Sequence, residues 1–232
     1  MSGFSAWLAD AEDTHAIKAI AVGLPTKRVE SWKYVPTRSL ARTTWKQADP
    51  QGVEQFALTA GSFVNVPTLD GLSVTEPDLL PGEQRRLDTI SDSHGFALTQ
   101  AALEHSRLIL TVEKTASVAI NLHHIANQAS SAGFATLVIR IEPGAQLTLI
   151  EQFDQVTVAQ ANLSSLRCLL TLDRDASVTH VRFQAANSNA HVFTNLDVEC
   201  GGHSSDRLQT IEFGSKLARS DIYVALAGKE AK

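Results

Sequence analysis

The pattern of apolar and polar positions changes character after residue 106. Before that point, apolar residues recur at helical spacing in two segments, 4–22 and 93–106, which we therefore predict to be helices. Between them, Pro and Gly punctuate the sequence from 41 to 86, so loops and short strands such as Phe63-Val64-Asn65-Val66 are expected there. The pattern predicts a helical and mixed amino-terminal region over residues 1–106.

After residue 106, short runs of aliphatic and β-branched residues dominate, as is typical of strands. The predicted strands are 108–112, 136–141, 147–151, 166–172, 177–183, 192–200, 208–213 and 221–226. The chain is thus expected to contain a second, all-β domain over residues 107–232.

A weak repeat recurs inside this β domain. Three segments align on Ala116, Ala145 and Ala176, and in each a turn feeds a small residue, a polar residue and an apolar residue that opens a strand. Gly201-Gly202-His203 is a candidate for a further copy. The alanines are 29 and 31 residues apart. A period of this length is typical of solenoids, whose units bury their apolar faces against their neighbours. An antiparallel sandwich is the alternative, but the Asn-Gly and Asp-Gly hairpin signals that it commonly uses are missing from this half.

Composition narrows the classes of function. The formal net charge is only −5 and the Lys and Arg residues look scattered, which argues against a nucleic-acid-binding protein. No apolar run approaches the roughly 18 residues of a membrane span, and the acidic amino terminus does not resemble an export signal. With two cysteines in no recognised spacing, a soluble protein of the cytoplasm is expected.

Strand parity predicts the role of the two cysteines, because alternate residues of a strand face opposite sides. Cys168 shares its face with the leucines of strand 166–172, and Cys200 shares its face with Leu196 and Val198. Both thiols are therefore expected in the core. Two core thiols are too few for a cysteine-ligated cluster, so we expect this chain alone to bind no cofactor stably.

The histidines offer little evidence of a metal site. His123 and His124 are adjacent, so on a strand their side chains diverge, and no companion ligand stands at a metal-site spacing. Their role stays open, with solvated or hydrogen-bonded side chains favoured. His180 and Arg182 are expected to share one outward face of their strand. No metal ligand is therefore assigned.

Enzyme signatures are largely missing from the sequence. Neither a GxxxxGK[ST] phosphate loop nor a GxSxG nucleophile motif occurs, and no catalytic residue is assigned. Glu151 and Asp154 could form a carboxylate pair on a β-helix face, as in polysaccharide-cleaving enzymes. A carbohydrate-active β-helix enzyme or binding module is therefore the alternative function, although solvated turn positions explain these two carboxylates more simply.

One stretch carries a resemblance to a known family. Residues 23–36 place a leucine-proline pair before an Arg, a Glu and a Trp-Lys-Tyr triplet, which resembles the amino-terminal signature of the SufD family. We take its signature residues as structural or partner-facing: Arg28, Glu30, Trp32, Lys33 and Tyr34. The sequence also resembles that family at Phe63-Val64-Asn65, Glu142-Pro143-Gly144-Ala145, Asn189-Ala190-His191, Arg219-Ser220-Asp221-Ile222 and Leu226-Ala227-Gly228.

The resemblance implies a mainly β fold with a right-handed parallel β-helix core behind an amino-terminal helical region. It also implies a non-catalytic scaffold subunit of the SufBCD iron–sulfur cluster assembly complex, which pairs with SufB and with the SufC ATPase and meets an iron–sulfur cluster only transiently, within the complex. The family continues beyond the position of Lys232 into further strands and a carboxy-terminal region that docks the ATPase. We therefore expect a truncated core with self-association through its open end, and carry over no cluster-forming residues.

Overall fold

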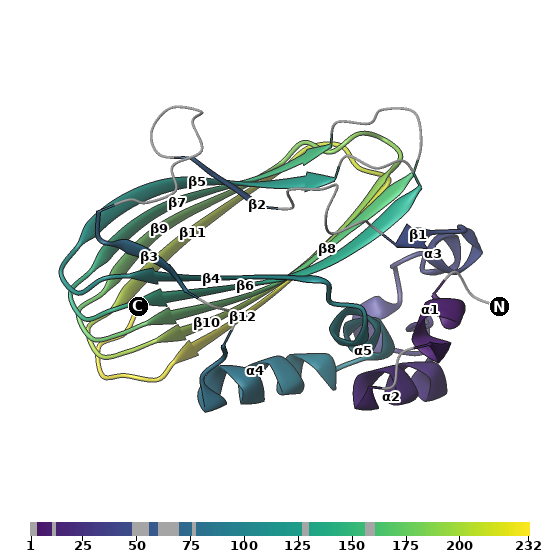
Figure 1. Cartoon of the computed structure of the whole chain (residues 1–232), viewed down its shortest axis with the longest axis horizontal. Coiled ribbons are helices and arrows are strands. Elements are labelled where there is room, and N and C mark those ends of the chain that lie inside the picture. The colour runs from purple at the N-terminus through teal and green to yellow at the C-terminus, as the bar shows by residue number, and fades with distance from the viewer. Residues whose placement is uncertain are drawn as a thin grey trace.

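The computed structural model shows helices packed against one side of a long two-sheet solenoid (Figure 1). It describes residues 4–10, 13–47, 56–59, 70–75, 78–126, 130–155 and 161–232. The helices are α1 Ser5–Ala9, α2 Thr14–Val22, the 3₁₀ helix η1 Glu30–Trp32, α3 Arg38–Arg42, α4 Pro81–Ser91 and α5 Gly95–Ala102. No helix in this described part of the chain is long and apolar enough to cross a bilayer.

The helical region differs from the sequence prediction in two places. The single helix predicted over 4–22 is two helices, because the Asp13 side chain accepts a hydrogen bond from the backbone amide of His15 and so caps the start of α2. The α4 helix begins inside the segment that was predicted as loops and short strands. Glu83 caps the start of α4, because its carboxylate accepts a hydrogen bond from the backbone amide of Leu80. The strand predicted at Phe63-Val64-Asn65-Val66 lies outside the described residues.

Within the described residues, twelve strands form two sheets. The first sheet has the order β12-β10-β8-β6-β4-β3 with β1 beside β6, and the second has the order β11-β9-β7-β5-β2. The strands are β1 Lys46–Gln47, β2 Phe56–Thr59, β3 Leu72–Thr75, β4 Ser106–Val112, β5 Ser117–Ala126, β6 Ser131–Ile141, β7 Gln146–Gln155, β8 Asn162–Leu172, β9 Ser177–Gln184, β10 Ala190–Cys200, β11 Ser205–Glu212 and β12 Leu217–Leu226. From β4 to β12 the chain alternates between the sheets, and these strands pair with one another in parallel, which confirms the predicted β-helix. The earlier strands β2 and β3 pair antiparallel with β5 and β4.

The repeat seen in the sequence corresponds to the turn that carries the chain from the first sheet to the second. Each copy places one residue in the left-handed region, at Thr115, Gly144, Asp175 and His203. The residue that follows is small, and it is fully buried in three of the four turns. The strands that these turns open, β5, β7, β9 and β11, pair residue for residue in register. The fourth copy suggested by Gly201-Gly202-His203 is therefore confirmed.

Inward side chains of the first sheet stack into apolar ladders. One ladder joins Leu108, Leu137, Cys168, Leu196 and Ile222 through consecutive strand pairs. A second ladder joins Ile141, Leu172, Cys200 and Leu226. Both cysteines belong to the main core cluster, as strand parity predicted, and both are free thiols. Each coil is thus stabilised mainly by the apolar surface that its neighbours cover.

The amino-terminal region is fastened to the outer face of the first sheet by ion pairs. Arg86 of α4 donates to the Asp197 carboxylate and to the Thr171 hydroxyl, the latter at 2.7 Å. Arg140 of β6 pairs with Glu83, Nε to Oε1, at 2.6 Å. These contacts explain why Asp197, which lies on the outer face of the sheet, is largely shielded from solvent.

Candidate functional site

The interior of the solenoid turns from apolar to polar along the second sheet. Strands β5, β7, β9 and β11 stack in register, so equivalent inward positions can be compared coil by coil. In the first coil most of these positions are aliphatic, whereas in the third and fourth most are polar. The inward residues are Val118, Ile120, Leu122 and His124; Leu147, Leu149, Glu151 and Phe153; Val178, His180, Arg182 and Gln184; and Asp206, Leu208, Thr210 and Glu212.

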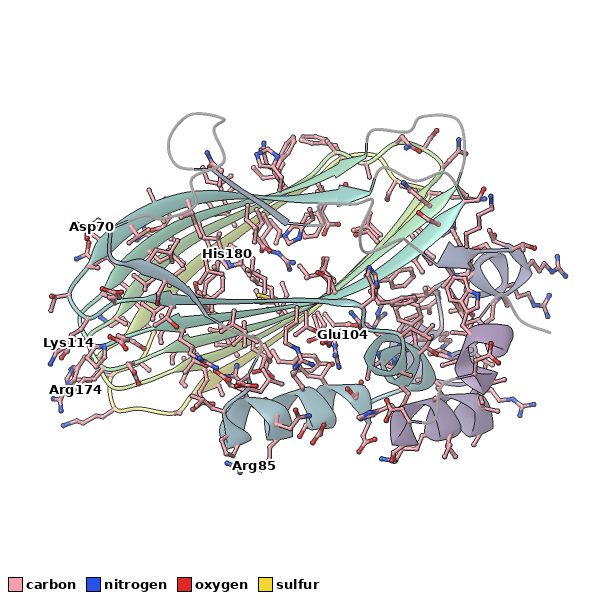
Figure 2. All side chains as sticks on the ribbon, viewed as in Figure 1. Asp70, Arg85, Glu104, Lys114, Arg174 and His180 are labelled. Carbon is pink, nitrogen blue, oxygen red and sulfur yellow. The ribbon has the colours of Figure 1, made fainter. Side chains whose placement is uncertain are left out.

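Glu151 is the centre of this polar interior, and its side chain is completely buried. Its carboxylate contacts three basic groups: His124 Nε2 at 2.8 Å, His180 Nε2 at 2.6 Å and Arg182 Nε at 2.8 Å. An ionised carboxylate only accepts, so both imidazoles carry their proton on Nε2. Figure 2 shows His180 between the two sheets. We call these four residues the lumen cluster.

Electrostatics keep the lumen cluster in a defined charge state. Burial acts to raise the pKa of Glu151, but the charges of Arg182 and His180 and the two histidine hydrogen bonds outweigh it, so this pKa lies well below its usual range. Burial lowers the pKa of His124 although Glu151 opposes the shift. At neutral pH the cluster therefore pairs a Glu151 anion with the Arg182 cation beside a neutral His124.

A narrow cavity continues from the lumen cluster toward the fourth coil. Its volume is about 10 Å³, which is room for a single water molecule rather than for a substrate. Arg182 Nη2 and both amide atoms of Gln184 line it without a hydrogen-bond partner within the described part of the chain. On the facing strands, the Ser220 hydroxyl bonds Thr194 Oγ1 at 2.8 Å and donates to Glu212 Oε1 at 3.0 Å.

This arrangement can hold fixed charges and a water molecule inside the solenoid. Burial raises the pKa of both the Cys168 and the Cys200 thiol, which keeps them protonated and poorly nucleophilic. Over the residues that the structure describes, no group of three or more His, Cys, Asp and Glu side chains is arranged to hold a metal ion.

Three predictions about these residues were wrong. His180 and Arg182 point into the interior rather than outward, because their register neighbours Leu149 and Glu151 do so. Glu151 is not a solvated turn carboxylate, and it cannot act as half of an exposed pair with Asp154. The outward-facing Val181 and Phe183 made the opposite orientation look preferable in the sequence.

Of the family signature residues, Trp32 is the structural anchor. Its side chain is buried, with its ring stacked on Phe193 at a centroid distance of 6.0 Å and an interplanar angle of 10°. Arg219 of β12 covers the ring at 4.3 Å and donates to the Ser31 carbonyl oxygen at 2.6 Å. Residues 23–36 join α2 to α3, and we call them the connector. Trp32 thereby ties the connector to strands β10 and β12.

The edge of the Trp32 ring meets His94, at a centroid distance of 4.7 Å. Burial lowers the pKa of His94 to about 4. The neutral Nδ1 of His94 accepts the backbone amide of Ala97 at 3.0 Å, and so caps α5. Trp32 therefore packs against the start of a helix as well as against the sheet.

The other four signature residues are exposed: Arg28, Glu30, Lys33 and Tyr34. Tyr34 is 86% exposed, and the ammonium of the neighbouring Lys33 lies 5.7 Å from its ring centre. Unlike Trp32, Tyr34 therefore does not anchor this segment to the core. A short aromatic motif in the sequence does not reveal which of its rings faces the core.

Comparison with known proteins matches the β domain to a characterised family. Residues 123–232 match the model described as "SUF system FeS cluster assembly, SufBD core domain". The chain is also 22% identical over 237 residues to the iron-sulfur cluster assembly protein SufD of Escherichia coli (strain K12). That match covers 94% of this chain and 56% of the relative, so the chain spans about half the length of the curated relative.

Proposed function

We propose that this chain is a non-catalytic scaffold subunit of the SUF iron–sulfur cluster assembly complex, in which it pairs with a SufB-like paralogue and a SufC-like ATPase. The match to the SufBD core model and the similarity to one SufD protein support this proposal. The observation that carries the proposal is the coincidence of the matched core domain, 123–232, with the coils of the solenoid. The similarity to an iron-sulfur cluster assembly protein extends over nearly the whole chain.

The solenoid suits a scaffold because it is rigid and filled by side chains. Its interior holds a charge cluster and a cavity of about 10 Å³, so a substrate would have to be handled on its surface or between subunits. The iron–sulfur cluster is in this proposal the cargo of the complex, and ATP is hydrolysed by the partner.

Co-purification tests the proposed function. The chain would be co-expressed with the SufB-like and SufC-like proteins of its own organism, with a tag on this chain alone. We expect both partners to be retained in a stable complex after gel filtration. Recovery of this chain without either partner, together with unchanged activity of iron–sulfur enzymes in cells that lack it, would contradict the proposal.

We predict that the purified chain alone stays essentially colourless after anaerobic reconstitution with iron and sulfide. Its two thiols face the core, and burial raises the pKa of both, so neither is a ready thiolate ligand. Visible absorption measures the outcome. A stoichiometric chromophore that is lost in the Cys168→Ser/Cys200→Ser variant would show that these thiols do ligate a cluster.

We also predict that the 232-residue chain self-associates through the end of the solenoid that β12 forms. The apolar side chains of this strand are largely exposed, with Val224 at 55% and Leu226 at 59%, and one edge of β12 has no strand beside it in the described part of the chain. Open strand edges pair readily with other strands. Sedimentation velocity over a concentration series should show a rising average mass.

A lysine substitution on β12 distinguishes association through the strand edge from non-specific hydrophobic association. Val224→Lys should keep the chain monomeric, because a charge on an edge strand blocks pairing. Ile17→Lys is the matched control, since Ile17 is 67% exposed on α2 in the helical region. Loss of association in the control but not in Val224→Lys would place the contact on the helices instead.

A further inference from the structure

Positive charge is concentrated in the connector and in α3 and β1, which follow it in the chain. Residues 27–47 contain six Lys and Arg residues but only one acidic residue, Glu30, so this segment carries a formal charge of +5 within a chain of net charge −5. The remainder of the chain therefore carries −10. The basic residues, which looked scattered in the sequence, are strongly segregated.

All six of these cations are exposed, and we call them the basic patch: Lys27, Arg28, Lys33, Arg38, Arg42 and Lys46. Lys33 lies 3.9 Å from Glu30, a long and exposed ion pair. The other five have no carboxylate partner among the residues that the structure describes. Elsewhere in the chain many exposed or half-buried arginines are paired, so this concentration of free positive charge is unusual for the molecule.

The basic patch surrounds a groove that is already formed. A cavity of about 670 Å³ lies between the segments 26–28 and 35–38, and its lining includes the side chains of Lys27, Arg28 and Arg38. The Thr37 hydroxyl donates to the Pro25 carbonyl oxygen at 2.8 Å, which ties the two walls together. Buried Trp32 fixes the turn between them, so an occupant would not have to order the groove.

The rest of the patch extends from one wall of the groove. Arg42 stands four residues after Arg38 on α3, so the two share one face of that helix. Lys46 begins β1, and the Trp45 indole donates to the Leu40 carbonyl oxygen at 3.0 Å, which holds β1 against α3. Apolar Val35 and Pro36 lie among the charges as part of the groove lining. An apolar centre with a charged rim is typical of protein interfaces.

We propose that this groove is a docking site for an extended acidic segment of a partner protein, with carboxylates on the basic patch and an apolar side chain against Val35 and Pro36. Charge complementarity supports this occupant, because none of the described residues that line the groove carries a carboxylate. A long nucleic acid fits less well, since it would run from this small patch onto the acidic remainder of the chain. This docking site goes beyond the proposed pairing with SufB-like and SufC-like subunits and does not depend on it.

Fluorescence anisotropy with the isolated chain tests the docking site. The probe is a labelled extended peptide that alternates Glu and Leu, and the matched peptide has Lys in place of Glu. We expect binding of the acidic peptide only, with an affinity that falls as salt rises from about 0.1 M toward 1 M, where the Debye length shrinks from about 10 Å to about 3 Å. Failure of the acidic peptide to bind, or equal binding of both peptides, would overturn the proposal.

Charge reversal locates the site. The double variant Arg28→Glu/Arg38→Glu should lower the affinity for the acidic peptide by about tenfold or more, which is about 1.4 kcal/mol of binding free energy. Lys114→Glu/Arg174→Glu is the control, because it changes the net charge equally at exposed turns that Figure 2 shows far from α3. An equal loss of peptide affinity in both variants would show that only the net charge of the chain matters, and it would overturn the proposal.

A nucleic acid is tested as the rival occupant. A labelled oligothymidylate with as many negative charges as the peptide should bind more weakly than the peptide does. Tighter binding of the oligonucleotide, lost in Arg28→Glu/Arg38→Glu and kept in the control, would assign the groove to nucleic acid and overturn the proposal. All variants change exposed side chains, so each should keep the melting temperature of the unmodified chain, which confirms that folding is intact.

Discussion

Trp32→Ala should lower the free energy of unfolding by about 3–5 kcal/mol, the range measured when a large buried aromatic is truncated. The ring is 1% exposed, and it fills the space between the connector, α5 and the outer face of β10. Its removal also leaves the Arg219 guanidinium without the aromatic face that it covers. Urea titration followed by circular dichroism measures the loss.

Tyr34→Ala is the matched control for this prediction. Both aromatics belong to the same signature triplet, but Tyr34 is 86% exposed, so its truncation should change stability by less than about 0.5 kcal/mol. Trp32→Phe should cost less than Trp32→Ala, because the indole nitrogen has no hydrogen-bond partner within the described residues and its loss leaves nothing unpaired. A loss below about 1 kcal/mol for Trp32→Ala would show that this ring does not anchor the connector.

Glu151→Gln should be similarly severe, costing about 3–5 kcal/mol, because it leaves the buried Arg182 cation without its counter-charge. Gln is nearly isosteric, so the loss would report charge rather than packing. Arg182 is 4% exposed and cannot reach water without disturbing the third coil. Glu113→Gln, at an exposed turn position, is the matched control and should be nearly neutral. A small loss for Glu151→Gln would mean that water already solvates the lumen cluster.

The pH dependence of stability follows from the lowered pKa values. The pKa of Glu151 is lower in the folded chain than the value of about 4.3 in the unfolded chain, so its contribution is present above about pH 4.3 and is lost as pH falls further. Buried His124 also has a lowered pKa, so stability starts to fall below about pH 6.5, where the unfolded chain takes up its proton first. The stability gap between the unmodified chain and Glu151→Gln should therefore narrow below about pH 4.3.

Strand parity succeeded for the cysteines and failed for the polar interior, and the reason is physical. Over 166–172 and 196–200, the strand face that carries Cys168 or Cys200 is apolar throughout, so burial of both thiols follows from the pattern alone. On β9, both faces carry apolar residues, and the inward His180 and Arg182 side chains are stabilised there by contacts with Glu151 of the preceding coil. A partner about thirty residues away in the sequence leaves no local signal, although Glu151 does share the parity of Leu147 and Leu149.

The sequence by itself favoured a solenoid over a sandwich, because a repeated turn that places a small residue before each strand is typical of stacked coils. It also determined that the two thiols are buried and that residues 23–36 are a distinct connector. The tertiary structure alone decided which signature residues are buried, where charge is enclosed and where it is left free. Those outcomes depend on contacts between coils and between the connector and the outer sheet, and such contacts join residues far apart in the chain.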